Sequence, residues 1–145
     1  MMRSQQSKNR KDGNIGQMLT ERELELRGVQ MVETIETGWG IVRGKGGRIV
    51  DAYPLEKVAG DFRGVLEGGR SVLVEAKTTP DRLPYSQLEK HQHDALQTHH
   101  ELGGLSLVAW VYDIENDGVI IFEYPNAAFV PRKSVKVGSV EEWYG

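Results

Sequence analysis

Hydrophobic and polar positions recur with helical and strand-like periods along the chain, and the first clear pattern is helical. Within residues 15–37, apolar or small residues repeat at spacings of four, three and four, as on one face of an amphipathic helix. The members of this face are Leu24, Gly28, Met31 and Ile35. The pattern predicts a first helix that ends at Gly38.

Two hairpins are predicted after this helix. Residues 39–50 have the pattern of a strand, a basic glycine-rich turn and a second strand. Residues 61–66 and 71–77 form a second pair of strand-like segments, which turns at Gly68 and Gly69. Each pair therefore predicts two neighbouring antiparallel strands.

The clearest helix of the chain is predicted between Ser86 and Leu102. Ser86 and Glu89 have the spacing of a capping box at its start. Gly103 and Gly104 follow its last residue, where glycine commonly ends a helix.

The remaining pattern predicts two more strands and the fold class. Residues 105–112 are almost continuously apolar, as in a central strand covered on both faces. A turn at 116–118 leads into a strand over residues 119–124, and residues 139–142 predict a last turn of helix. The order of helix, strands, helix and strands predicts an α/β fold, in which residues 15–145 form one domain with a mixed central sheet flanked by helices.

Length and composition place limits on this picture. The 145 residues suffice for one domain, and residues 1–14 are polar and basic. They predict a flexible basic arm, either simply solvated or in contact with phosphates. The chain has no cysteine, which excludes disulfides, thiol catalysis and cysteine-based zinc sites.

Charge and hydropathy indicate the surroundings of the protein. No apolar run is long enough to span a bilayer, and the N-terminus lacks the apolar segment of a secretory signal. We therefore expect a cytoplasmic protein without membrane contact. The net charge of −3 does not favour nucleic-acid binding by the whole surface, so such binding would depend on local basic patches.

Candidate chemistry lies at the end of the strand predicted over residues 71–77. Glu75 and Lys77 share one face of that strand, because side chains alternate along it. The preceding hairpin turn brings Asp61 alongside Glu75. Two converging carboxylates, with the carbonyl of Ala76, form a hard-oxygen site that suits Mg²⁺, for which Mn²⁺ could substitute. The alternative is a cross-strand salt bridge on the sheet surface.

The helix that follows adds a polar residue to the same region. Gln92 and His99 share one helical face with apolar neighbours, so both are predicted to point inward. A buried glutamine needs hydrogen-bond partners. Gln92 is therefore either a group that supports an active site or a satisfied amide of the core.

These residues together resemble a known superfamily. Asp61 followed by Glu75-Ala76-Lys77 matches the D…(D/E)xK signature of the PD-(D/E)XK nucleases. The stretch from Gly60 through Thr78 to His91-Gln92 and the next strand is similar to that of the RecU-type Holliday-junction resolvases. The resemblance implies a restriction-endonuclease-like fold and a homodimer that acts on branched DNA.

The resemblance also implies roles for individual residues. Asp61 and Glu75 would bind Mg²⁺, Lys77 would assist the attacking water, and Gln92 would support the site. Such nucleases usually add a glutamate from the first helix, where Glu25 is the first candidate and Glu21 the second. Glu25 is preferred because it shares a face with apolar residues of that helix. Glu23 and Glu33 compete with them.

The segment before Asp61 differs from the family. RecU-type proteins carry a longer insertion there, which forms a stalk that enters the junction. Here the segment between Ile41 and Asp61 is short and contains a basic glycine-rich turn. Candidate phosphate-binding residues lie in this turn and around the carboxylates; they are Arg43, Lys45, Arg48, Arg63, Arg70, Arg82 and Lys90.

Histidine does not suggest a zinc site in this chain. All four histidines, His91, His93, His99 and His100, fall on one predicted helix, where the spacing of His91 and His93 turns them in different directions. The predicted function is therefore Mg²⁺-dependent hydrolysis of DNA phosphodiesters, as in a junction resolvase. Two alternatives remain open: a nuclease of the same fold that cuts linear, flapped or sequence-specific DNA, and a non-catalytic DNA-binding module.

Overall fold

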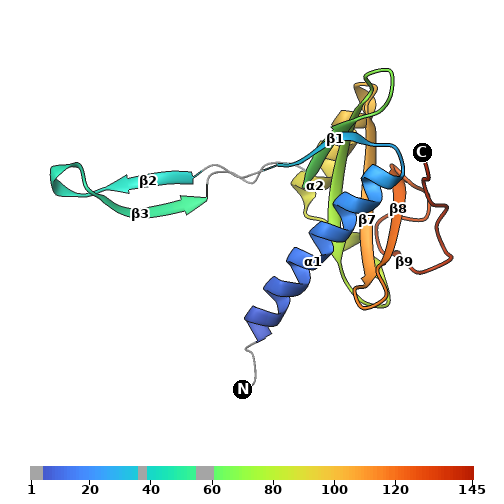
Figure 1. Ribbon diagram of the computed structural model, residues 1–145, viewed down its shortest axis with the longest axis horizontal. Coiled ribbons are helices and arrows are strands. Elements are labelled where there is room, and N and C mark those ends of the chain that lie inside the picture. Colours follow the sequence, from blue (N-terminus) through green and yellow to red (C-terminus); the bar gives the residue numbers. More distant parts are fainter. Residues whose placement is uncertain (1–4, 36–38, 55–60) are drawn as a thin grey trace.

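The computed structural model describes residues 5–35, 39–54 and 61–145, and the side chains of residues 14–35, 42–51 and 61–145 (Figure 1). Gly38, the predicted end of the first helix, lies outside these residues. In the described part of the chain, no helix has the length and apolar character needed to span a membrane.

The domain is built on a five-stranded mixed sheet with the strand order β1-β4-β5-β7-β8. The β5–β7 pair is parallel and the other three pairs are antiparallel. The predicted α/β fold with a mixed central sheet is thus confirmed. The strands are β1 (Gln30–Thr34), β4 (Phe62–Val65), β5 (Ser71–Thr78), β7 (Leu105–Asp113) and β8 (Gly118–Tyr124).

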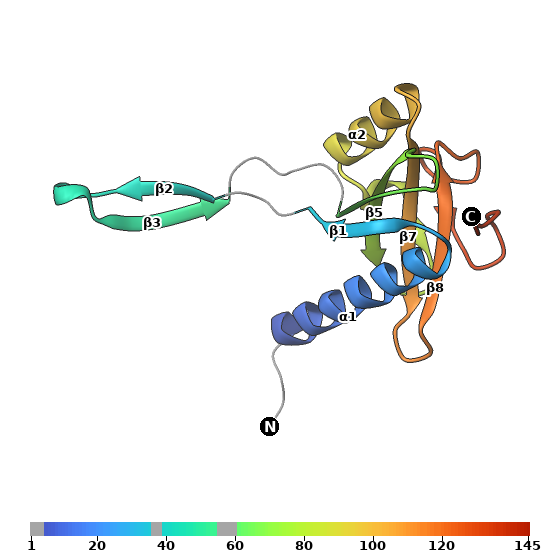
Figure 2. The same cartoon turned by 45° about the horizontal axis from the view of Figure 1, so that its top comes forward.

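One helix covers each face of this sheet (Figure 2). Helix α1 (Gln5–Leu26) buries Leu24 in a cluster with Val72 and Val74 of β5. Helix α2 (Lys90–Glu101) buries Leu96 in a second cluster with Trp110 of β7 and other residues. Residues 105–111 are all buried, as predicted for a central strand covered on both sides.

The prediction of one helix over residues 15–37 is wrong at both ends. The helix begins at Gln5 and ends at Leu26, and residues 30–34 form the edge strand β1. Gly28 was counted as a member of the apolar face, but its φ of +98° lies in the left-handed region that ends a helix. Met31 is exposed rather than buried. The flexibility predicted for residues 1–14 stays a prediction.

The second helix starts later than predicted. Residues 85–87 form a short 3₁₀ helix, η2 (Tyr85–Gln87), and α2 begins at Lys90 with Glu89 as its N-cap. The capping box therefore joins Glu89 to Gln92 instead of Ser86 to Glu89. Its predicted end is confirmed by Gly103, which has a φ of +97°.

The C-terminal segment does not form the predicted turn of helix at residues 139–142. The Ser139 hydroxyl bonds the backbone of Lys136 instead, within a tight turn. The Trp143 N–H donates to the Ile121 carbonyl at 2.7 Å, so this segment covers the outer edge of β8. A hydrogen bond to an otherwise unpaired backbone carbonyl at the sheet edge is thus formed in place of a single helical turn.

Two small sheets complete the fold. The predicted hairpin at residues 39–50 is confirmed as β2 (Trp39–Arg43), η1 (Lys45–Gly47) and β3 (Ile49–Pro54), and Figure 1 shows it standing away from the five-stranded sheet. The other small sheet, β6 (Leu83–Pro84) with β9 (Ser134–Val135), was not predicted.

Candidate active site

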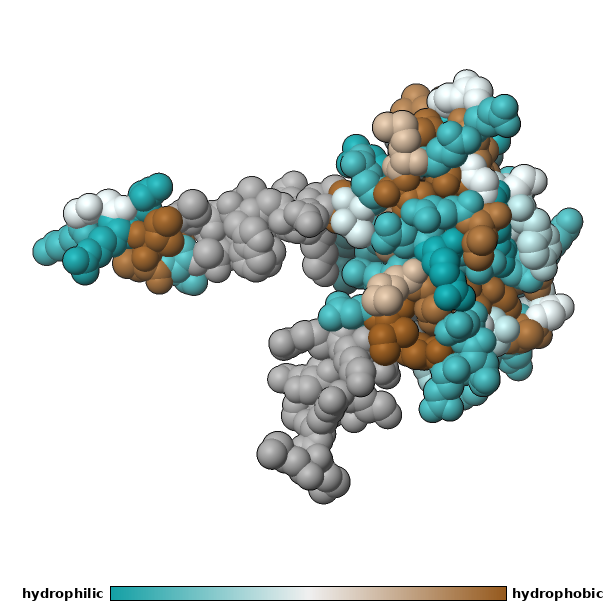
Figure 3. Space-filling view, in the orientation of Figure 1, coloured by the Kyte–Doolittle hydropathy of each residue, from teal (hydrophilic) through white to brown (hydrophobic). Residues whose placement is uncertain are grey.

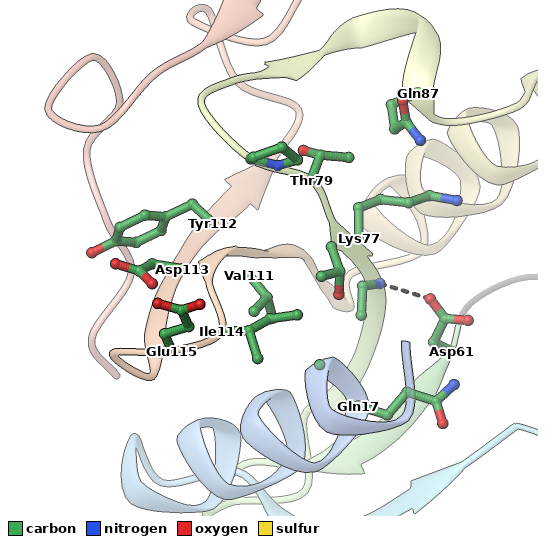
Figure 4. Close-up of a pocket in the computed structure, with 14 residues that line it drawn as sticks. Gln17, Asp61, Lys77, Thr79, Gln87, Val111, Tyr112, Asp113, Ile114 and Glu115 are labelled. Atoms are coloured by element: carbon green, nitrogen blue, oxygen red, sulfur yellow. Dashed lines mark hydrogen bonds between the residues drawn. The ribbon is translucent and has the colours of Figure 1, made fainter. Parts of the chain in front are cut away.

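A cleft of about 630 Å³ opens where β5 and β7 end, between helix α1 and the loop that follows β5 (Figure 4). Asp61, Ala76 and Lys77 line it, so three of the predicted site residues share one cavity. The other lining residues are Gly16, Gln17, Thr78, Thr79, Pro80, Gln87, Val111, Tyr112, Asp113, Ile114 and Glu115.

Asp61 is fixed beside β5 by its backbone and its side chain. Its N–H donates to the Val74 carbonyl at 2.8 Å, which continues the β4–β5 pairing by one residue. Its Oδ2 accepts a hydrogen bond from the Ala76 N–H at 2.7 Å. Because the N–H and C=O of one residue point to the same side of a strand, the Ala76 carbonyl is directed to the edge that Asp61 occupies.

Glu75 lies on the α2 face of β5 and is only 1% exposed. Its Oε1 accepts a hydrogen bond from Nε2 of Gln92 at 2.7 Å. The Oε1 of Gln92 in turn accepts from the Glu89 N–H at 2.8 Å, within the capping box. The amide of Gln92 therefore has one orientation, and the prediction that it points inward is confirmed.

Lys77 lies on the same face of β5 as Glu75, one pleat further along the strand. Its side chain is half-buried, and Figure 4 shows it extending from β5 with Asp61 on the neighbouring edge. Among the described residues, no ion pair joins Lys77 to Asp61. The alternative was a surface salt bridge among Asp61, Glu75 and Lys77, and its Asp61–Lys77 part finds no support in the structure.

Helix α1 reaches the cleft at a different place from the one predicted. Among the side chains of α1 that the structure describes, residues 14–26, the buried positions are Gly16, Leu19, Thr20 and Leu24. Glu25 is exposed, so the expectation that it points toward the core is wrong. Leu24 occupies the buried face of the helix, and Glu25, the next residue, is turned toward solvent. Gln17 lines the cleft beside Asp61 instead (Figure 4).

Glu21, Glu23 and Glu33, the other candidates for the additional glutamate, do not line the cleft either. Glu23 pairs with Arg27, with its Oε1 2.9 Å from Nε, and Glu33 lies 3.8 Å from Nε of Arg63. Gln17 fell within the predicted helix but was missed because only the glutamates of that helix were considered as site candidates. Gly16 is the sequence feature that could have indicated this part of α1, because its missing side chain lets the helix approach Thr78 closely.

Comparison with known families gives this geometry a context. A family model described as "Recombination protein U" matches residues 19–132, which is most of the chain and includes Asp61, Glu75, Lys77 and Gln92. The chain belongs to the recombination protein U family. No curated protein matches the chain.

Membership supports an endonuclease at the level of the family, since recombination protein U proteins are Holliday-junction resolvases that act on branched DNA. The family resemblance inferred from the D…ExK motif and the His-Gln pair is thus confirmed.

The basic candidates lie in several different places. Arg82 is exposed and follows the cleft residues Thr79 and Pro80 in the chain. Lys90 is exposed at the start of α2, where its Nζ lies 2.9 Å from Oδ2 of Asp94. Arg63 is on β4 at the same end of the sheet as Asp61.

Arg70 stands apart from the cleft, at the opposite end of β5 from Lys77. Its guanidinium donates to the carbonyls of Gly103 at 3.2 Å and Gly104 at 3.3 Å. These bonds hold the turn between α2 and β7, so the position favours a structural role for Arg70.

The remaining three candidates, Arg43, Lys45 and Arg48, are exposed around the turn of the β2–β3 hairpin. Nη1 of Arg43 donates to the Gly47 carbonyl at 2.8 Å and so closes this turn. Val42, Ile49 and Val50 are exposed on the same hairpin, where Figure 3 shows apolar residues next to polar ones.

The histidines do not form a common site. Within the described residues, no group of three or more histidine, cysteine or acidic side chains is placed to hold a metal ion. His93 is buried between Tyr85 and Tyr124, with Nδ1 2.8 Å from the Tyr124 hydroxyl and Nε2 2.9 Å from the Tyr85 carbonyl. His99 contacts serines at the other end of α2.

The oxygen donors in and next to the cleft nevertheless fit Mg²⁺. They combine two carboxylates, Asp61 and Glu75, with the carbonyl of Ala76, and all three donors are oxygen atoms. Mg²⁺ usually keeps several waters and takes only one or two protein carboxylates. Asp61 and Ala76 line the cleft and the Glu75 carboxylate is buried next to it, so this all-oxygen set suits Mg²⁺, whereas zinc favours nitrogen and sulfur ligands.

Proposed function

We propose that the chain is a Mg²⁺-dependent, structure-selective DNA endonuclease that resolves Holliday junctions. The observation that carries this proposal is the placement of Asp61 and Lys77 in one cleft, next to Glu75, whose carboxylate is held by Gln92. Two acids that can hold a metal ion and a lysine that can offset developing charge suit phosphodiester hydrolysis by metal-activated water.

Each residue would have a distinct task. Asp61, Glu75 and the carbonyl of Ala76 would hold the metal, and Gln92 would keep the Glu75 carboxylate in position. When bound, Mg²⁺ polarises a phosphate oxygen and lowers the pKa of bound water. The ammonium group of Lys77 would orient the attacking water or offset the charge that develops on the phosphate.

The β2–β3 hairpin supports selectivity for branched DNA. It is short, yet it stands away from the sheet and carries exposed cations around its turn (Figure 1). Such a projection can contact a branch point that a flat surface cannot reach. Cutting a junction symmetrically needs two active sites, so a two-fold homodimer is part of the proposal.

Two other functions are consistent with the same cleft. One is a nuclease of this fold that cuts linear, flapped or sequence-specific DNA. The other is a DNA-binding module without catalysis. The presence of Asp61, Glu75, Lys77 and Gln92 together favours a catalytic site over the binding module.

A cleavage assay separates these functions. Wild-type protein and the Glu75→Gln variant are incubated with Mg²⁺ and matched four-way-junction, splayed and linear duplex DNA. Paired symmetric cuts in the junction alone, lost in Glu75→Gln, are the expected result. Cleavage of all three substrates would leave a nuclease without junction selectivity. Binding without any cleavage would favour the binding module.

A further inference from the structure

The small β6–β9 sheet brings basic residues from two distant parts of the chain to the rim of the cleft. Leu83 of β6 pairs with Val135 of β9 in antiparallel register. The strand β6 comes directly after the loop that contains Thr79 and Pro80, which line the cleft. The strand β6 therefore begins close to the rim of the cleft, and β9 lies beside it.

The register places two cations opposite each other. Leu83 and Val135 are both 0% exposed, so their side chains form the inner face of the small sheet. Continuing the antiparallel register by one residue sets Arg82 opposite Lys136. Side chains alternate between the two faces, so both point outward, and both residues are exposed.

Like charges directly opposite each other on two strands destabilise the pair. Within the described part of the chain, neither Arg82 nor Lys136 forms an ion pair, although Asp81 is adjacent in sequence. Arg132 and Lys133 add two more exposed cations just before β9, also without an ion pair among the described residues. Four cations gathered in this way favour an anion with closely spaced charges.

We propose that these four residues, the β6–β9 basic surface (Arg82, Arg132, Lys133 and Lys136), bind the phosphate backbone of the DNA that enters the cleft. The inference rests on the proposed nuclease function. DNA presents one negative charge about every 1.7 Å along its axis, which suits neighbouring cations better than an isolated ion would. Three of the residues come from the C-terminal segment, far from the catalytic motif in the sequence.

The test uses two variants, each of which replaces one positively charged side chain with a neutral glutamine. Lys136→Gln removes a cation from the basic surface, whereas Arg22→Gln removes one whose Nη2 already pairs with Asp117 Oδ2 at 3.4 Å. Binding to junction and duplex DNA is measured by fluorescence anisotropy without Mg²⁺ over a range of salt concentrations. We expect Lys136→Gln to lower the slope of log K against log salt by about 0.9. Arg22→Gln should leave the slope close to that of the wild type.

A charge reversal separates binding from a structural role. In Lys136→Glu the new carboxylate faces Arg82, so an opposed pair of cations becomes a cross-strand ion pair. We expect the dissociation constant for DNA to rise by about tenfold or more while the melting temperature stays the same or rises. A purely structural role for Lys136 would lower both stability and affinity.

The outcomes distinguish this inference from the proposed function. If the wild type binds no DNA, both the proposed nuclease function and the basic surface are overturned. If the wild type binds and cleaves DNA but both Lys136 variants keep its affinity and salt slope, only the basic surface is overturned. A melting temperature that falls together with affinity in Lys136→Glu would also overturn it.

Discussion

Nε2 of Gln92 lies 2.7 Å from Oε1 of Glu75, and this bond ties the first turn of helix α2 to the buried carboxylate on β5. The same amide accepts the Glu89 N–H and so completes the capping box of the helix. One side chain therefore caps the start of a helix and holds a candidate metal ligand. Loss of the amide should affect both the stability of the fold and the position of the carboxylate.

Gln92→Ala should lower the free energy of unfolding by about 1–3 kcal/mol, because it removes a helix cap and a hydrogen bond to a buried carboxylate. Urea denaturation measures the change. Gln97→Ala is the matched control, since Gln97 donates to Glu101 at 3.0 Å on the exposed side of the same helix. That variant should change the free energy by less than about 0.5 kcal/mol. Equal losses in both variants would contradict a special role for Gln92.

Lys77→Ala should abolish cleavage while DNA binding is largely kept. The half-buried ammonium group is placed in the cleft, where it would act on the reacting phosphate rather than on the outer surface. Loss of one such electrostatic group costs on the order of 10²–10³-fold in rate. Single-turnover cleavage and anisotropy, measured on the same DNA, check the two parts. Wild-type turnover in the variant would remove Lys77 from the mechanism.

The candidate site motif was the most predictable part of the molecule. Alternation along β5 placed Glu75 and Lys77 on one face, and helical spacing turned Gln92 inward, because both periods are set by the local backbone. The hairpin turn at Gly68 and Gly69 brought Asp61 alongside the same strand. These interactions are close in sequence, and local patterns describe them well.

Other features depend on contacts that no local pattern contains. The edge strand β1 was taken for helix because Gly28 fitted a helical spacing, although its backbone ends the helix. The β6 and β9 strands have two residues each, too few to show a period, and they pair across distant parts of the chain. The predicted capping box of Ser86 and Glu89 was replaced by one of Glu89 and Gln92, whose side chain also bonds Glu75 on the distant strand β5.

Asp61→Asn should remove a Mg²⁺-dependent rise in melting temperature. A ligand that binds only the folded state at 100 times its dissociation constant stabilises it by about 2.7 kcal/mol. Wild-type protein should therefore melt higher in Mg²⁺, as measured by calorimetry. Glu115→Gln is the control, because Glu115 is an exposed carboxylate that lines the same cleft but is not among the candidate site residues. A shift that survives in Asp61→Asn but disappears in Glu115→Gln would place the metal elsewhere.

Gly16→Ala should destabilise the protein, although alanine normally favours a helix. A Cβ at Gly16 would collide with Oγ1 of Thr78 on β5, where helix and strand are in close contact. Overpacking of this kind costs about 1–3 kcal/mol. Thr78→Ala in the same chain removes the colliding atom and should restore part of the loss. A double-mutant cycle with no coupling would contradict the close contact.

His99 should make the fold less stable in mild acid. The Ser106 hydroxyl donates to the Leu96 carbonyl at 2.7 Å, so its oxygen accepts from Nδ1–H of His99 at 2.9 Å. Nε2 then accepts from the Ser71 hydroxyl at 3.0 Å, and the neutral ring is fully bonded. Burial, followed by the charges of Arg70 and His100, lowers the pKa of His99 from its usual 6.5.

The sign of the effect follows from proton binding. Because the pKa is lower in the folded state, the unfolded chain binds more protons below pH 6.5, and the free energy of unfolding falls as the pH drops below that value. Urea denaturation between pH 7.5 and 5 should show this loss, and His99→Gln should reduce its slope. His100→Gln, on the exposed side of the same helix, should keep most of the slope. If His99→Gln retains the full slope, another group is responsible for the acid sensitivity.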